Sequence, residues 1–323
     1  MGSDDLTRVR SYFLRNSRVK EFSGYGGKIH TLAWNVSGSR LASGSSDKLV
    51  NLYAIDSSKL VKVHTFRGHN ESVDQLCWHP SDPELLATVG ADGAVRLWDC
   101  RSKKDPITAQ LKGENINLAW SSDARCIAVG NKTDLISWLD VRAGLKPIQS
   151  EQFNFEINEF AWKPNTDIFL LTTGLGSILV YSGKPGDMRR ETSLQAHPVN
   201  AMCLQFTNSG RYFAVGSADA LVSIWDADEF VCIRTLSRTF GPVVTLKYPD
   251  YSLPVGWNGP FELWVSLTTQ SCSQLPVRIT SLTLVTWKQV RCSNVSLLLL
   301  FVSHLYLAEV TTRDIVSLVC RAR

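Results

Sequence analysis

The chain has 323 residues, of which 44% are hydrophobic, and this supplies enough apolar material to bury a full core. Its formal net charge of +4 is mildly basic and falls short of the strongly basic character of a dedicated nucleic-acid-binding domain. The eight cysteines form no C-x-x-C pair, which argues against the common zinc sites. The first ten residues are charged and contain no apolar signal-peptide core, so we expect reduced, buried thiols in a protein of the cytosol or nucleus.

The N-terminal segment, residues 1–22, is basic. Its five basic side chains before the first glycine-rich turn are Arg8, Arg10, Arg15, Arg18 and Lys20. They could contact RNA phosphates without reading sequence. We favour the simpler interpretation of a short amphipathic helix that packs Tyr12, Phe13 and Val19 against the protein, so that any RNA contact is weak or indirect. Residues 20–22 are expected to form a strand that closes the ring of repeats described next.

From residue 23 to residue 248 a short pattern recurs, in which an apolar residue stands two positions before an aromatic one. The six pairs are Leu32/Trp34, Leu76/Trp78, Leu118/Trp120, Phe160/Trp162, Leu204/Phe206 and Leu246/Tyr248. Successive aromatic residues are 44, 42, 42, 44 and 42 positions apart. A period of about 40–45 residues with strand-like segments is typical of a β-propeller with four-stranded blades. Because one such unit cannot bury its own apolar face, the repeats must stack around an axis.

The clearest repeat runs from Arg67 to Leu111, and turn-forming residues divide it into four expected strands. These strands are Val73–Trp78, Leu85–Val89, Ala94–Trp98 and Ile107–Leu111. The repeat resembles the WD40 family, with Gly68-His69 at its start, Asp92 in the turn before the third strand and Trp98-Asp99 at that strand's end. The resemblance implies an all-β propeller of a seven-bladed family, whose last blades are here incomplete or replaced.

The WD40 resemblance also implies a hydrogen-bonded tetrad that holds the strands of a blade together. In the second repeat its members would be His69, Thr88, Asp92 and Trp98. Asp92 would accept a hydrogen bond from the His69 imidazole, which would meet the Thr88 hydroxyl. That hydroxyl would in turn reach the indole N–H of Trp98.

Other repeats keep this tetrad only in part. The retained members are His197, Asp219 and Trp225 in the fifth repeat and Ser43 and Asp47 in the first. Val215 takes the hydroxyl position of the fifth repeat, and Tyr25 and Tyr53 take the His and Trp positions of the first. The His/Asp pairs resemble catalytic acid–base pairs, but they recur at one repeat position without a nucleophile. We therefore expect a structural role, no enzyme activity, no cofactor and no metal.

The repeat pattern ends after Tyr248. Residues 249–323 contain no Gly-His start and only ten charged side chains among 75 positions. Diverged blades, a distinct β appendage, and a retained intron or shifted reading frame all remain open, and we favour the last because every repeat landmark disappears at once. The apolar run Val295–Ala308 has 14 residues, fewer than the roughly 20 of a spanning helix, and is expected to be a buried strand pair or an artefact. A ring left open by such a tail would have an unpaired edge.

Four runs are more specific than the repeat itself. They are Arg67–Pro80, Lys112–Trp120, Glu151–Glu159 and Gly216–Asp226. Together these runs resemble the THO complex subunit 3 family over about residues 20–248. The resemblance implies a nuclear, non-catalytic subunit that docks onto larger subunits of the transcription–export assembly and helps couple transcription to messenger RNA processing and export.

Two other function classes stay open. One is a different WD40 adaptor, such as a chromatin or histone-peptide reader, which would use the same blades differently. The other is a propeller enzyme, which would need polar residues converging on the central channel. No membrane and no small-molecule ligand is expected as a partner.

Overall fold

The computed structural model of the chain describes residues 25–56, 59–102, 104–237 and 241–247, together with the backbone of three later strands. Tyr25–Leu246 forms one compact unit, and the three later strands belong to a second unit. Within these described residues there are strands and turns but no helix. None of the described segments is therefore a helix long and apolar enough to cross a membrane.

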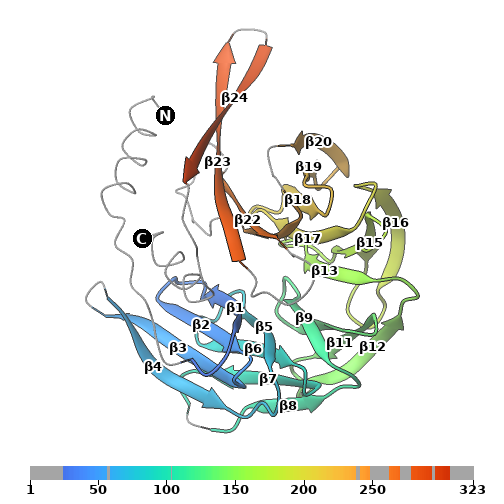
Figure 1. Cartoon of the computed structure of the whole chain (residues 1–323). Coiled ribbons are helices and arrows are strands. Elements are labelled where there is room, and N and C mark those ends of the chain that lie inside the picture. Colours follow the sequence, from blue (N-terminus) through green and yellow to red (C-terminus); the bar gives the residue numbers. More distant parts are fainter. Residues whose placement is uncertain are drawn as a thin grey trace. The chain divides into compact units, whose positions relative to one another are not determined.

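The first unit contains five consecutive antiparallel sheets of four strands each, which we call blades one to five (Figure 1). Blade one consists of β1 (Ile29–Trp34), β2 (Arg40–Ser45), β3 (Leu49–Asp56) and β4 (Lys59–Arg67). Blade two consists of β5 (Val73–Trp78), β6 (Leu85–Gly90), β7 (Ala94–Asp99) and β8 (Ile107–Gln110). Blade three consists of β9 (Asn115–Trp120), β10 (Cys126–Asn131), β11 (Leu135–Asp140) and β12 (Lys146–Gln152).

Blade four consists of β13 (Ile157–Trp162), β14 (Phe169–Thr173), β15 (Ser177–Ser182) and β16 (Arg189–Gln195). Blade five consists of β17 (Ala201–Phe206), β18 (Tyr212–Ser217), β19 (Val222–Asp226) and β20 (Val231–Leu236). The strands of blade two match the predicted bounds to within one residue at each end. The predicted propeller-blade architecture is confirmed.

The recurring aromatic residues occupy one equivalent place in successive blades. Trp34, Trp78, Trp120, Trp162 and Phe206 are the last residues of β1, β5, β9, β13 and β17. The first strand of each blade contacts the first strand of the next, which makes these strands the innermost ones. The outermost strands carry exposed side chains, whereas all six residues of β10 are buried. The core therefore lies between the middle strands of neighbouring blades.

Indole hydrogen bonds tie two of these recurring aromatic residues to the preceding blade. Trp78 donates its Nε1–H to the carbonyl of Ala33 in the preceding blade at 2.9 Å, and Trp120 donates to the carbonyl of Cys77 at 3.2 Å. Each indole thus buries its ring in one blade interface and satisfies a backbone carbonyl of the neighbouring blade.

In a second set of bonds the side chain belongs to the preceding blade: the third residue of its innermost strand accepts a backbone N–H of the next blade. Thr31 Oγ1 accepts a hydrogen bond from the N–H of Leu76 at 3.3 Å, and Glu159 Oε2 accepts one from the N–H of Leu204 at 3.0 Å. Gln75 accepts the N–H of Leu118 in the same way. These bonds fix the register between blades, since a shift of one residue would lose them all.

Strand β21 (Val243–Lys247) continues the pattern after blade five. The thiol of Cys203 donates to the carbonyl of Val243 at 3.4 Å. A Cβ added to Gly216 would lie only 2.5 Å from the Val243 side chain, so the two strands approach too closely for any other residue there. The first residues of β21 therefore pack on blade five as the innermost strand of a further repeat.

Two of the three strands of the second unit are longer than any strand of the five blades. β22 (Glu262–Thr269), β23 (Arg278–Cys292) and β24 (Val295–Leu305) pair antiparallel in that order. β23 has 15 residues and β24 has 11, whereas the strands of the five blades have four to nine. Residues 295–305 of the apolar run Val295–Ala308 form one strand, which pairs with β23, and not a strand pair within the run. The origin proposed for residues 249–323 stays a prediction.

Candidate functional site

The candidate tetrad residues of blade two form one connected network. His69 Nδ1 lies 3.0 Å from Asp92 Oδ1, and His69 Nε2 lies 2.8 Å from Thr88 Oγ1. The indole Nε1–H of Trp98 donates to the same hydroxyl at 2.9 Å. Since Nδ1 must carry the proton that Asp92 accepts, Nε2 accepts the proton of the Thr88 hydroxyl. Every polar atom along this chain is therefore used within the blade.

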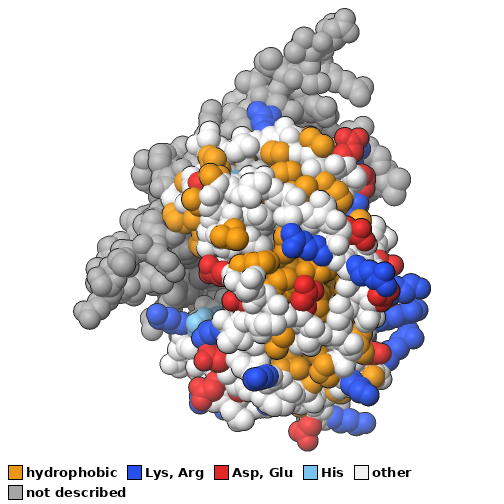
Figure 2. Space-filling model, turned by 90° about the vertical axis from the view of Figure 1, so that its right-hand side faces the viewer, with side chains coloured by type: hydrophobic (Ala, Val, Ile, Leu, Met, Phe, Trp, Pro, Cys, Tyr) orange, Lys and Arg blue, Asp and Glu red, His pale blue; other side chains and the backbone are white. Residues whose placement is uncertain are grey.

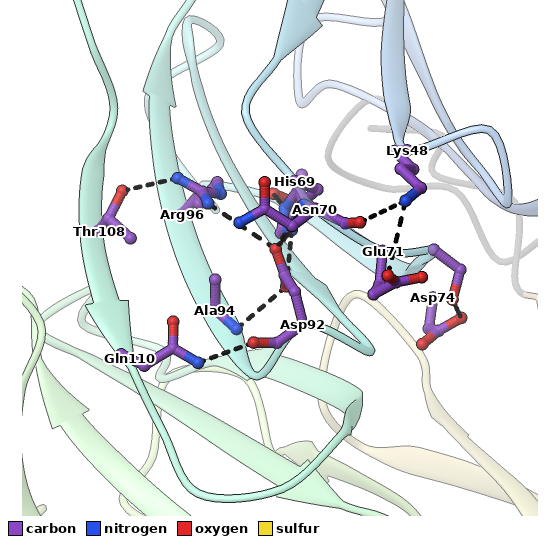
Figure 3. A network of polar contacts seen from close by, with 12 residues as sticks. Lys48, His69, Asn70, Glu71, Asp74, Asp92, Ala94, Arg96, Thr108 and Gln110 are labelled. Atoms are coloured by element: carbon purple, nitrogen blue, oxygen red, sulfur yellow. Dashed lines mark hydrogen bonds and ion pairs between the residues drawn. The ribbon is translucent and has the colours of Figure 1, made fainter.

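Asp92 is the centre of a wider set of contacts (Figure 3). Its carboxylate accepts the backbone N–H groups of Asn70 at 2.9 Å and Ala94 at 3.1 Å, and Arg96 Nη2 lies 3.7 Å away. Gln110 on the outermost strand donates to the Asp92 carbonyl at 2.7 Å. Asp92 thereby connects the segment before β5, the turn before β7 and the strands β7 and β8, through its carboxylate and its backbone carbonyl.

The electrostatics of the pair favour a neutral imidazole and an ionised carboxylate. Burial lowers the pKa of His69, and the neighbouring Asp92 offsets only part of that effect. Burial by itself would raise the pKa of Asp92. The N–H of Asn70 and the contact with His69 outweigh it, so that the pKa lies below its ordinary value. Both groups are held in one protonation state in the interior.

Blade five completes its tetrad with a residue that the sequence interpretation missed. His197 Nδ1 lies 2.9 Å from Asp219 Oδ2, and His197 Nε2 lies 2.9 Å from Ser223 Oγ, to which Trp225 donates its indole N–H at 2.8 Å. Val215, at the expected hydroxyl position, lies directly opposite Ser223 in the sheet. The hydroxyl group is thus supplied by β19 instead of β18. A serine two residues before the tryptophan is the sequence signal that could have identified it.

The hydrogen-bond distances among Ser223, His197 and Asp219 resemble those of a hydrolase triad, but a substrate cannot reach these side chains. Ser223 is 1% exposed and His197 is 2% exposed. The serine hydroxyl already donates to His197 and accepts from Trp225. A nucleophile must reach a substrate carbonyl, so this arrangement holds the blade together and offers no catalytic site.

Blade one replaces the histidine and tryptophan of the tetrad with tyrosines. The hydroxyl of Tyr25 lies 2.9 Å from Ser43 Oγ and also contacts the hydroxyl of Tyr53. Asp47 accepts the N–H of Gly26 at 2.9 Å and that of Leu49 at 3.1 Å. Burial raises the pKa of Tyr53, which keeps its hydroxyl protonated as a hydrogen-bond donor. In blade one a different set of side chains therefore takes the structural role of the tetrad.

Comparison with known proteins agrees with this pattern of complete and incomplete tetrads. The family model for the WD domain, G-beta repeat, matches residues 16–53, 60–99 and 188–226, which contain the tetrads of blades one, two and five. THO complex subunit 3 of Arabidopsis thaliana is 40% identical over 268 residues, which cover 80% of this chain and 83% of that protein. The chain belongs to the THO complex subunit 3 family.

Other relatives share less sequence with this member of the THO subunit 3 family. The WD repeat-containing protein AAC3 of Dictyostelium discoideum is 27% identical over 269 residues, which cover 76% of this chain and 56% of the relative. The anaphase-promoting complex subunit cdc20 of the same organism is 33% identical over 129 residues, with 38% and 26% of the two chains covered. The WD40 assignment made from the sequence is confirmed.

Several predicted residues of this THO subunit 3 family member cannot be placed. Tyr248, the five basic residues of the segment 1–22 and the expected closing strand 20–22 lie outside the described residues. In the part of the chain that is described, no cluster of three or more His, Cys, Asp or Glu side chains could hold a metal ion.

Proposed function

We propose that this chain is a non-catalytic scaffold subunit of a THO-type assembly in the nucleus, where protein–protein docking couples transcription to messenger RNA processing and export. The observation that carries the proposal is the 40% identity to THO complex subunit 3 of Arabidopsis thaliana over 83% of that protein. A scaffold role needs a rigid surface, and the bonds between successive blades supply rigidity.

The distribution of charge supports docking to proteins. On the face shown in Figure 2, Lys and Arg side chains are interspersed with Asp and Glu, and hydrophobic side chains are spread among them. A surface of mixed sign fits specific contact with protein partners better than it fits the continuous basic stripe of a nucleic-acid-binding domain.

Affinity purification of the tagged full-length chain from nuclear extract, followed by mass spectrometry, tests the proposal. We expect the other subunits of the THO complex to co-purify in comparable amounts, and a tag-only sample is the control. Recovery of histone-modifying enzymes without THO subunits would reject the proposal in favour of a chromatin or histone-peptide reader.

Direct RNA binding by the N-terminal segment is a separate question. We expect that neutralising the five basic residues of the segment 1–22 leaves RNA affinity unchanged, because the segment is expected to pack as an amphipathic helix. A filter-binding assay at fixed salt measures this. Affinity that falls with each neutralised residue, and a shallower salt dependence, would instead assign a phosphate contact.

A further inference from the structure

The blades present two different ends, and one of them carries a pair of exposed aliphatic residues. Because neighbouring strands are antiparallel, the innermost strand of each blade begins at the end where the second strand turns into the third. We call this end the entry face. In blades four and five its loops are residues 153–156, 174–176, 196–200 and 218–221.

Leu175 and Val199 are both exposed, on adjoining loops of the entry face. Leu175, in the turn between β14 and β15, is 65% exposed, and Val199, in the connection to β17, is 43% exposed. Gln195 donates to the Leu175 carbonyl at 3.0 Å. A Cβ added to Gly176 would lie 2.4 Å from the Val199 carbonyl oxygen, so the two loops touch at a residue with a φ of +79°. We call Leu175 and Val199 together the 175/199 patch.

The fold itself does not require an aliphatic side chain at position 175. In blade two the equivalent turn residue is Asp92, whose carboxylate points inward to His69 and the turn amides. In blade four the same place holds Leu175, the most exposed of the large hydrophobic side chains among the described residues. An exposed leucine on a rigid turn offers apolar area that a docking partner can bury.

The charge around the patch indicates the chemistry of that partner. The four loops contain two acidic residues, Glu156 and Asp219, and no lysine or arginine. Glu156 is exposed and lies beside the turn, because a Cβ on Gly174 would be 2.7 Å from its Oε2. On the entry face of blades one to three the acids are balanced instead, as Lys48 pairs with Glu71 and Lys132 with Glu114.

The run Glu151–Glu159, one of those that resemble the THO subunit 3 family, supplies the entry loop that holds Glu156. Within it Asn154 and Glu156 are exposed, and Phe155 packs partly buried against the core shared by blades three and four. One of the runs that carry the family resemblance therefore borders the 175/199 patch.

We propose that the 175/199 patch docks a segment of a larger THO subunit in which an aliphatic or aromatic anchor is flanked by Lys or Arg. The inference rests on the proposed function. The anchor covers Leu175 and Val199, and the basic residues meet Glu156, which has no lysine or arginine beside it in these loops.

Site-specific photocrosslinking in the assembled complex tests the proposal. The full-length chain carries p-benzoylphenylalanine in place of Leu175, or in place of Ile233 as a control that is 55% exposed on the outermost strand β20. Both are combined with the other purified THO subunits. We expect a crosslink from position 175 to a basic, apolar segment of another subunit, and none from position 233.

The alternatives give different results. A complex that assembles but crosslinks only from position 233, or that crosslinks position 175 to a second copy of the chain, overturns the docking proposal and leaves the proposed function standing. A crosslink from position 175 to an acidic segment also overturns it. Failure of the complex to assemble with the unsubstituted chain overturns both.

Affinity measurements separate the apolar and charged parts of the contact. The double variant Leu175→Ser/Val199→Ser should bind the other subunits at least about tenfold more weakly, whereas Val231→Ser/Ile233→Ser, equally exposed on β20, should bind as the unsubstituted chain does. Glu156→Lys should weaken binding most at low salt. Equal losses in both double variants, or no loss in either, would overturn the proposal.

Discussion

At the scale of single residues, the Thr88 hydroxyl decides whether the network of blade two is satisfied. It donates to His69 and accepts from Trp98, and its residue is fully buried. The isosteric Thr88→Val change would leave a ring nitrogen and an indole N–H without partners. We expect it to lower the free energy of unfolding by about 1–3 kcal/mol. Urea denaturation measures this, with Thr192→Val on the exposed face of β16 as the control. Equal effects of the two changes would contradict the prediction.

The pKa of His69 predicts the direction of the pH dependence. Burial lowers the pKa in the folded state, while the unfolded chain titrates near the ordinary value of 6.5. Below that pH the unfolded state therefore binds more protons, and stability falls as pH drops toward the folded pKa. The lowered pKa of Asp92 acts in the same direction below its ordinary value of 3.8. Its stabilising contribution is present above that value and is lost in acid.

The variant His69→Gln isolates the histidine contribution to this acid sensitivity. As the pH is lowered from about 7 to about 5, the free energy of unfolding of the unsubstituted chain should fall more steeply than that of the variant. The difference in slope should be up to about 1.4 kcal/mol per pH unit. Urea denaturation at several pH values measures the difference. His64→Gln, at an exposed position of β4, is the control and should keep the full slope. Parallel curves for the chain and His69→Gln would contradict the assignment.

Residue positions could be predicted where one repeat carries its own signals. His69, Asp92 and Trp98 stand at fixed offsets within a single repeat, and the structure brings them together with Thr88. Ser223 does not stand at the expected hydroxyl position, so its only sequence signal is its place two residues before Trp225. Its hydroxyl matters only because Ser223 faces Val215 across β18 and β19, and cross-strand register is not visible in spacing.

At the scale of elements, two tryptophans provide a matched test of the hydrogen bonds between blades. Trp78 and Trp162 both end an innermost strand and are 5% and 7% exposed. Trp78 donates its indole N–H to Ala33, whereas Trp162 Nε1 is buried without a hydrogen-bond partner among the described residues. Trp78→Phe should therefore destabilise the chain by about 1 kcal/mol more than Trp162→Phe. Both changes remove a similar buried apolar area, but only Trp78→Phe removes a hydrogen bond.

Urea denaturation of the two variants measures this difference, and Trp120→Phe, which loses the bond to Cys77, should behave like Trp78→Phe. A larger loss for Trp162→Phe would mean that ring packing outweighs the indole bond. The strands themselves could be predicted, because alternation and turn residues lie within each repeat. The bonds between blades could not, because Thr31 and Leu76 meet only after the blades have stacked.

At the scale of the whole molecule, the period of 42–44 residues predicts a chain of units that each contact mainly their neighbours. The regularity ends after blade five and the start of β21, where the strands become longer and the charged residues fewer. Each blade of such an array is stabilised by the blades that it packs against. The terminal blades therefore determine how cooperatively the array unfolds.

We therefore expect the full-length chain to melt over a broad range with a low midpoint, because terminal blades unfold before central ones. Circular dichroism and tryptophan fluorescence should give transitions that do not coincide. THO complex subunit 3 of Arabidopsis thaliana, melted under the same conditions, is the control and should unfold more sharply. A single sharp transition at high temperature, coincident in both signals, would show that residues 249–323 complete the ring. It would also remove the reason to regard them as foreign to the repeat.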